Sequence, residues 1–176
     1  MEKGKPAEKE YQEFIDCLNR HGVDYMIIGA YAVMKHTKIA RVTKDIDFWI
    51  KDNIENAKKV AAAIKDFIGI EVNPQDLLVK DEIYYIGVPP RRVDIFCNQA
   101  DMDYDEVSRR KEKDKFLNSE AFFISIDDLI KLKEYYKSKE NAEEYEKDIK
   151  RLEKVRGEPR PSEDSHKKTS DSELTL

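Results

Sequence analysis

The chain has 176 residues, a length typical of one domain that buries a core without disulfide or metal cross-links. Charged residues make up 39% and hydrophobic residues 40% of the chain, which is typical of a soluble protein with a charged exterior. The net charge of -5 argues against a surface that binds polyanions in general, although a local basic patch beside an acidic site would still attract a nucleotide or RNA.

Neither the cysteines nor the apolar segments indicate export or membrane insertion. The two cysteines, Cys17 and Cys97, have no CxxC or Cys/His spacing. Residues 1–10 lack the apolar run of a secretory signal, and no segment approaches the roughly 20 apolar residues of a membrane span. We therefore expect a cytoplasmic protein with no membrane partner.

The first part of the chain predicts alternating helices and strands. In chain order we expect a helix over 11–21, a strand over 25–28, a short helix over 30–36, a strand over 46–50 and a helix over 54–67. Gly29 ends the first strand and opens the helix that follows, and Asp52 or Asn53 caps the last helix.

The second part predicts short strands followed by helices. Four β-type runs lie at 70–72, 77–79, 83–88 and 93–97, and the last two form a hairpin. An edge strand over 122–124 leads to Ser125, which caps a helix over 126–136, and a final helix covers 142–155. The predicted fold class is α+β, a small mixed sheet flanked by helices, with helices at the C-terminal end.

Both ends of the chain are predicted to lie outside the domain. From Gly157 the sequence has no sizeable apolar residue until Leu174, so this segment cannot bury enough surface to offset its ordering entropy. We expect a flexible N-terminus over 1–9, one domain over 10–156 and a disordered tail over 157–176.

Two carboxylates open the second predicted strand, in the sequence TKDIDFWI of residues 43–50. Side chains alternate along a strand, so Asp45 and Asp47 share one side, with alpha carbons roughly 6.6 Å apart. Ile46 and Phe48 then point into the core. Two such charges about 4 Å apart repel by about 1 kcal/mol in water and about 4 kcal/mol in a partly shielded site, and a bound cation reverses the sign.

A third carboxylate, Asp94, interrupts the apolar sequence RVDIF of residues 92–96. If that strand lies beside the Asp45–Asp47 strand, three carboxylates meet at one edge of the sheet. Their oxygens suit Mg²⁺ or Mn²⁺, which are commonly held by few carboxylates together with substrate phosphates. Two ions roughly 3.5 to 4 Å apart would clamp the attacking oxygen and the phosphates, while Asp94 takes the proton of the acceptor hydroxyl.

The context separates a metal site from the turn or capping chemistry for which Asp-x-Asp is also typical. Gly29 opens a helix whose free N–H groups could receive phosphate oxygens. A lone glycine there is more often a tight turn, so the prediction depends on the combination of the glycine, the paired aspartates and the distal aspartate.

This ordered set resembles the nucleotidyltransferases of the DNA polymerase beta superfamily. The likeness runs from about Asp24 to Leu152, and its motifs are IIGA at 27–30, DID at 45–47 and Asp94. More narrowly, GAYAV at 29–33, RVTKDID at 41–47 and IDDLIKLK at 126–133 are similar to minimal bacterial and archaeal nucleotidyltransferases, a group that includes the toxins of type IV toxin–antitoxin systems.

The resemblance implies a nucleoside triphosphate, magnesium, and transfer of a nucleoside monophosphate onto a hydroxyl or phosphate acceptor. Two features depart from the family's pattern. Ala30 stands where the family usually has a second glycine or a serine, so only backbone N–H groups are available to phosphate there. Lys133 and Asp148 match the family's C-terminal lysine and acidic residues only loosely.

The predicted site has a metal-binding and catalytic part and a nucleotide-binding part. The first comprises Asp45, Asp47 and Asp94, and the second comprises Gly29, Ala30, Arg41, Thr43 and Lys133. Arg41 suits phosphate because a guanidinium forks onto phosphate oxygens. A solvated charge is the alternative for Arg41 and Lys133, and simple strand packing for Thr43. A solvated charge is also favoured for Lys44, with phosphate neutralisation as the alternative. Structural roles are favoured for His36, with substrate contact as the alternative, and for the hairpin-turn charges Arg91 and Arg92, with RNA guidance as the alternative.

Three hypotheses about function follow. The leading one is an active magnesium-dependent nucleotidyltransferase whose acceptor is RNA, protein or a small molecule. The second, motivated by Ala30 and by the loose match at the C-terminal end, is a nucleotide-binding or partner-binding module that kept the fold and lost turnover. The third is a toxin-like enzyme held in check by an antitoxin-like partner. Fold analogy alone does not name the acceptor.

Overall fold

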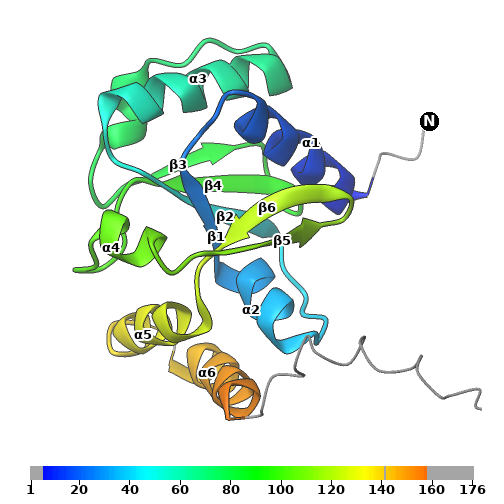
Figure 1. Ribbon diagram of the computed structural model, residues 1–176, viewed down its shortest axis with the longest axis vertical. Coiled ribbons are helices and arrows are strands. Elements are labelled where there is room, and N and C mark those ends of the chain that lie inside the picture. The colour runs from blue at the N-terminus through cyan, green and yellow to red at the C-terminus, as the bar shows by residue number, and fades with distance from the viewer. Residues whose placement is uncertain (1–5, 141, 158–176) are drawn as a thin grey trace, which may run out of the picture.

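The computed structural model describes residues 6–140 and 142–157, which build a six-stranded mixed sheet between two layers of helices (Figure 1). The strands are β1 (Tyr25–Ile28), β2 (Asp45–Ile50), β3 (Ile83–Ile86), β4 (Arg92–Phe96), β5 (Glu112–Phe116) and β6 (Ser119–Phe123). Their order in the sheet is β3-β4-β2-β1-β6-β5. β2 pairs antiparallel with β1 and parallel with β4, which places the carboxylate-bearing strands side by side and meets the condition on which the three-carboxylate site depends.

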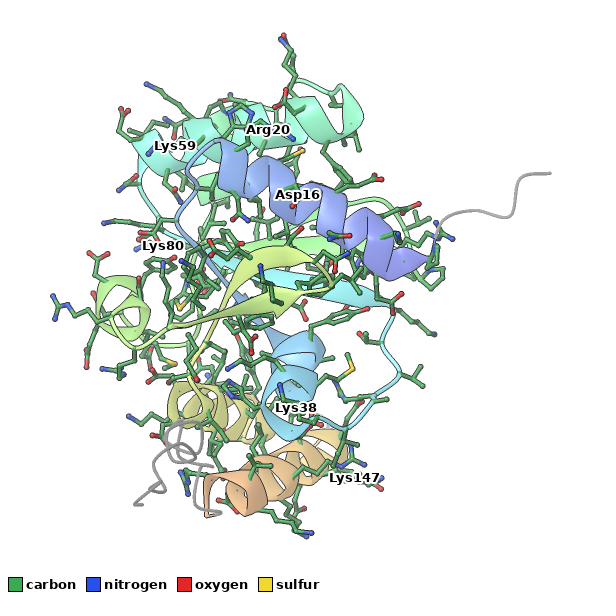
Figure 2. The ribbon with its side chains drawn as sticks, turned by 45° about the vertical axis from the view of Figure 1, so that its right-hand side comes forward. Asp16, Arg20, Lys38, Lys59, Lys80 and Lys147 are labelled. Atoms are coloured by element: carbon green, nitrogen blue, oxygen red, sulfur yellow. The ribbon has the colours of Figure 1, made fainter. Side chains whose placement is uncertain are left out.

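Helices cover both faces of the sheet. They are α1 (Ala7–Arg20), α2 (Gly29–Thr37), α3 (Ile54–Ile68), α4 (Tyr104–Ser108), α5 (Ile126–Lys137) and α6 (Ala142–Arg156), with a short 3-10 helix η1 (Pro74–Leu78). Figure 1 shows α1 and α3 on one face, and α2, α5 and α6 on the other. In Figure 2, Lys38 at the end of α2 and Lys147 on α6 lie on the side of the sheet opposite Asp16 of α1.

The pleat of β2 separates the core from the site. Ile46 and Phe48 are fully buried, and the Phe48 ring lies 5.3 Å from that of Phe14 on α1. Asp45 and Asp47 are only partly buried and face the α2 side. The alternation predicted from the sequence is confirmed, since it sends apolar side chains to one face and carboxylates to the other.

The predicted helix starts are confirmed by their caps. The side chain of Asn53 accepts a hydrogen bond of 2.8 Å from the backbone N–H of Asn56 at the start of α3. The hydroxyl of Ser125 accepts one of 3.1 Å from the N–H of Asp128 at the start of α5. Each cap satisfies one backbone donor that the first helical turn leaves without a partner.

Two predicted strands, 70–72 and 77–79, are wrong. Residues 70–73 have no regular structure, and Pro74–Leu78 form η1. Pro74 has no N–H to donate to a strand, and the side chain of Asn73 accepts from the N–H of Gln75, which favours a helical turn. The predicted hairpin of 83–88 with 93–97 is confirmed as β3 and β4.

The region after β4 differs most from expectation. The short helix α4 and the strand β5 are not predicted by the sequence, and residues 122–123 of the run expected at an edge end β6, which lies between β1 and β5. β5 has the charged sequence EKDKF and buries only Phe116 well, so it lacks the apolar alternation of a typical strand.

The ends of the domain are only partly within the described residues. α1 begins at Ala7, so residues 7–9 of the segment expected to be flexible are helical. Most of the predicted tail, 158–176, lies outside the described residues. Among 6–140 and 142–157, no helix has the length and apolar character needed to cross a bilayer.

Candidate active site

The turn from β1 into α2 sets one wall of the candidate site. Gly29 follows β1 with a φ of 69°, a left-handed conformation that favours glycine. The preceding residue, Ile28, pairs with Asp47 in the sheet, so Gly29 lies against that carboxylate. A Cβ on Gly29 would lie 2.1 Å from Oδ2 of Asp47. Only glycine therefore lets the start of α2 approach the Asp47 carboxylate this closely.

Three carboxylates converge beside this turn. In the parallel pair of β2 and β4, Asp47 lies opposite Asp94, and Asp45 lies two residues before Asp47 on the same side of β2. Oxygens of Asp45, Asp47 and Asp94 all lie within 4.8 Å of one another. Asp94 is only 3% exposed, whereas Asp45 and Asp47 are partly open. The structure thus brings together the three residues predicted as the metal-binding part.

The carboxylates perturb one another. Burial raises the pKa of Asp47 well above its ordinary value, and the charges of Asp45 and Asp94 raise it further. Burial also raises the pKa of Asp94, and the hydrogen bond and positive charge of Arg92 partly offset this rise. Desolvation and like charges both disfavour the ionised form, so the cluster gains from a positive charge placed among its oxygens.

The oxygen donors fit a divalent cation. Three carboxylates offer hard oxygen ligands, and residues 6–140 and 142–157 add no sulfur or imidazole to the cluster, which is the donor set that Mg²⁺ and Mn²⁺ prefer. The arrangement leaves further ligand positions to water or to substrate phosphates.

Arg92, expected as a charge of the hairpin turn, is a member of the candidate site. It opens β4 and lies opposite Asp45. Its Nε donates to Oδ1 of Asp94 over 2.6 Å, and its Nη2 lies 3.0 Å from Oδ2 of Asp94 and 3.2 Å from Oδ2 of Asp45. The i, i+2 spacing of Arg92 and Asp94 was the signal that could have found it, since both residues share one face of β4.

Arg41 and Lys133 meet on a carboxylate of α6. Nη2 of Arg41 lies 2.5 Å from Oε1 of Glu144 and 3.3 Å from Oδ2 of Asp148. Nζ of Lys133 lies 3.1 Å from the same Asp148 oxygen and 5.4 Å from the centre of the Tyr145 ring. Burial lowers the pKa of Lys133, while Asp148 and the more distant Asp47 oppose the change. Asp148, a loose match in the sequence, is thus the residue that ties both cations to α6.

The remaining nucleotide-binding candidates lie close to the carboxylates. Ala30 is buried in the first turn of α2. The Thr43 hydroxyl lies 3.0 Å from the backbone oxygen of Asp45 and 3.4 Å from its Oδ1. Lys44 is exposed. The loop before β2 therefore borders the site, with Thr43 fixing the first residue of the strand.

Two other charged residues have structural partners. Nε2 of His36 lies 2.8 Å from the backbone oxygen of Ile124, which ties α2 to the end of β6. Nη1 of Arg91 lies 2.5 Å from Oε1 of Glu10 on α1. Both contacts agree with the structural roles favoured for these residues.

Two cavities open on either side of Asp47. One, of about 520 Å³, is lined by the start of α2, the 41–45 loop and α6. The other, of about 470 Å³, extends along the ends of β3 and β4 toward α5 and includes Phe96, Gln99 and Tyr136. Gly29, Asp47, Lys133 and other residues line both cavities. Asp47 therefore lies where two ligand-sized spaces meet, and Asp45 borders the first of them.

Comparison with known proteins places this geometry in a recognised fold. The sequence matches no protein-family model and no curated protein. Among solved structures, the chain is similar to the lincosamide antibiotic adenylyltransferase LnuA, determined with lincomycin bound. The TM-score is 0.53 and the identity 19%, over 84% of this chain and 97% of that one. At this identity the likeness concerns the fold, and it confirms the expected α+β, nucleotidyltransferase-like architecture.

Proposed function

We propose that the protein is a magnesium-dependent nucleotidyltransferase, which moves a nucleoside monophosphate from a nucleoside triphosphate to an acceptor hydroxyl or phosphate and releases pyrophosphate. The observation that carries the proposal is the convergence of Asp45, Asp47 and Asp94 within 4.8 Å, beside a glycine turn that opens a helix. The nucleotidyltransferase-like fold supports it independently.

The three aspartates have distinct roles in this proposal. Asp45, Asp47 and Asp94 would hold the metal, whose positive charge stabilises the α-phosphate and the leaving pyrophosphate. The acceptor oxygen bonds to the α-phosphorus as the bond from that phosphorus to pyrophosphate breaks. For a hydroxyl acceptor, the proton passes to Asp94.

The triphosphate is assigned to the side of α2 and α6. Backbone N–H groups at the start of α2, from Gly29 and Ala30 onward, face phosphate oxygens without needing a side-chain hydroxyl. Arg41 and Lys133 add two positive charges on the border of the larger cavity. Their partner Asp148 holds both in place before the nucleotide arrives.

The acceptor is assigned to the cavity along β3, β4 and α5. It measures about 470 Å³, within the range of small-molecule sites, and its walls combine apolar and aromatic side chains with charged and amide side chains. LnuA acts on a lincosamide antibiotic, and its structure contains lincomycin. A small hydroxylated molecule is therefore the first acceptor class to test, followed by RNA and protein.

A transfer assay tests the proposal. The protein is incubated with each labelled nucleoside triphosphate, with magnesium or EDTA, and with pools of small hydroxylated compounds, RNA or protein. We expect label on one pool, dependent on magnesium and lost in Asp47→Asn and Asp94→Asn. Asp105→Asn is the matched control, because Asp105 is an exposed carboxylate on α4 paired with Lys51. Transfer that survives Asp47→Asn would refute the assignment.

The same assay separates the two other hypotheses. Magnesium-dependent nucleotide binding without transfer to any pool would favour the inactive binding module suggested by Ala30. Transfer to RNA or protein that stops growth on expression, and is relieved by a co-expressed neighbouring gene, would favour a toxin with an antitoxin-like partner.

A further inference from the structure

Arg92 occupies the oxygens that a metal ion would need. Its guanidinium contacts both oxygens of Asp94 and one oxygen of Asp45, at 2.6 to 3.2 Å. Two parallel N–H···O contacts to one carboxylate are the strongest geometry available to arginine. Asp47 is the carboxylate to which Arg92 makes no contact among those recorded for the described residues.

A second contact holds the guanidinium in place. Its central carbon lies 4.4 Å from the centre of the Tyr85 ring on the neighbouring strand β3, where Tyr85 pairs with Asp94. The Arg92 side chain is 28% exposed, so its ion pairs are partly shielded from water. A partly desolvated cation over an aromatic face adds to the attraction of the carboxylates. Arg92 therefore has three partners that fix it across the cluster.

Arg92 cannot keep all of its contacts with these oxygens while a divalent cation binds the same oxygens. An arginine remains charged throughout the normal pH range and cannot itself act as a ligand to the metal. Binding of the cation to Asp94 and Asp45 requires the guanidinium to give up at least part of its three contacts. A triphosphate offers it other oxygens with the same forked geometry.

The geometry points to Arg92 as a built-in competitor of the metal, which keeps the affinity of the three-aspartate cluster for a free divalent cation low and couples metal binding to triphosphate binding. The inference rests on the proposed function, because it concerns the same cluster. Reciprocal coupling follows, since two ligands that displace the same contact strengthen each other's binding.

Metal affinity in the absence of turnover tests the inference. Mn²⁺ binding is measured by the electron paramagnetic resonance of the free ion, with and without a nonhydrolysable nucleoside triphosphate. We expect Arg92→Met to bind Mn²⁺ alone about tenfold more tightly, and to lose most of the enhancement that the triphosphate gives the wild-type protein. Arg92→Lys keeps the charge without the fork and should lie between the two.

Arg91→Met is the matched control. It removes the same charge one residue away, where the arginine pairs with Glu10 rather than with the cluster, so Mn²⁺ affinity should stay within about twofold. Thermal unfolding in EDTA shows whether each variant is folded, and Arg92→Lys keeps the test valid if Arg92→Met is not.

The sign of the change decides the result. If Arg92 only holds the carboxylates in position, its loss weakens Mn²⁺ binding, which overturns the inference. An unchanged affinity also overturns it, while leaving the metal site and the proposed function intact. Absence of Mn²⁺ binding in every protein, or binding insensitive to Asp94→Asn, would instead contradict the proposed function along with the inference.

Discussion

Replacing Gly29 with alanine should separate the chemistry of the site from the stability of the fold. The left-handed backbone at φ 69° costs an alanine about 1 to 2 kcal/mol. The added Cβ would also lie 2.1 Å from Oδ2 of Asp47, so the carboxylate must retreat by about 0.9 Å to reach even the 3.0 Å limit of real contacts. A displacement of this order at a reacting centre costs about 100-fold in rate.

Gly69→Ala supplies the control for backbone strain. Gly69 ends α3 with a φ of 72°, and a Cβ there meets no atom within 4 Å. Both variants should lose about 1 to 2 kcal/mol of unfolding free energy in urea through backbone strain, and Gly29→Ala should lose more because of the collision with Asp47. Only Gly29→Ala should lose about 100-fold in nucleotidyl transfer and bind Mn²⁺ more weakly. In an Asp47→Ala background the collision is relieved, so Gly29→Ala should then lower the unfolding free energy only through backbone strain. Equal losses of Mn²⁺ affinity in both glycine variants would refute the reasoning.

Two further predictions concern buried charge. Asp47→Asn should raise the free energy of unfolding in EDTA by about 1 kcal/mol, because burial and the charges of Asp45 and Asp94 disfavour the ionised carboxyl. A raised folded-state pKa gives stability that is lost as the pH rises through it, so thermal unfolding should show the gain growing as the pH rises above the ordinary aspartate range, and a gain that falls would contradict this. Asp148→Ala leaves the Lys133 ammonium buried without its partner and should lower the free energy of unfolding in urea by about 3 kcal/mol. Glu143→Ala on the same helix removes an exposed ion pair with Lys147 and should lower it by under about 0.5 kcal/mol. Equal losses in the two variants would contradict the assignment.

Local rules predicted much of the site. The alternation of side chains along a strand was enough to place Asp45 and Asp47 on one side and Phe48 in the core. The apolar neighbours of Asp94 were enough to assign it to a strand. The pattern left open whether the two strands are neighbours, and the parallel pairing of β2 with β4 shows that they are.

Features that depend on pairing between distant segments cannot be predicted from local sequence patterns. β5 is charged on its exposed side and is recognisable only through its pairing with β6. The runs 70–72 and 77–79 are apolar, yet the Asn73–Pro74 turn between them prevents a strand. Short apolar runs carry no information about which partner, if any, completes their hydrogen bonds.

The cationic residues show the same limit. The sequence allows Arg41 and Lys133 to be phosphate ligands or solvated charges, and it does not indicate that they share a partner. Their common contact with Asp148 arises only when α6 packs against α5 and the 41–45 loop. Arg92 differs, because its spacing from Asp94 was visible in the sequence and its contact with Asp45 required the register of β2 against β4.

The most direct test of the central claim is a crystal structure of the protein with Mn²⁺ and a nonhydrolysable nucleoside triphosphate, in which anomalous scattering locates the metal. We predict a metal bonded to oxygens of Asp45, Asp47 and Asp94, with phosphate oxygens of the nucleotide completing its ligands at the start of α2. A nucleotide bound elsewhere, or a metal that makes no bond to these three carboxylates, would contradict the account.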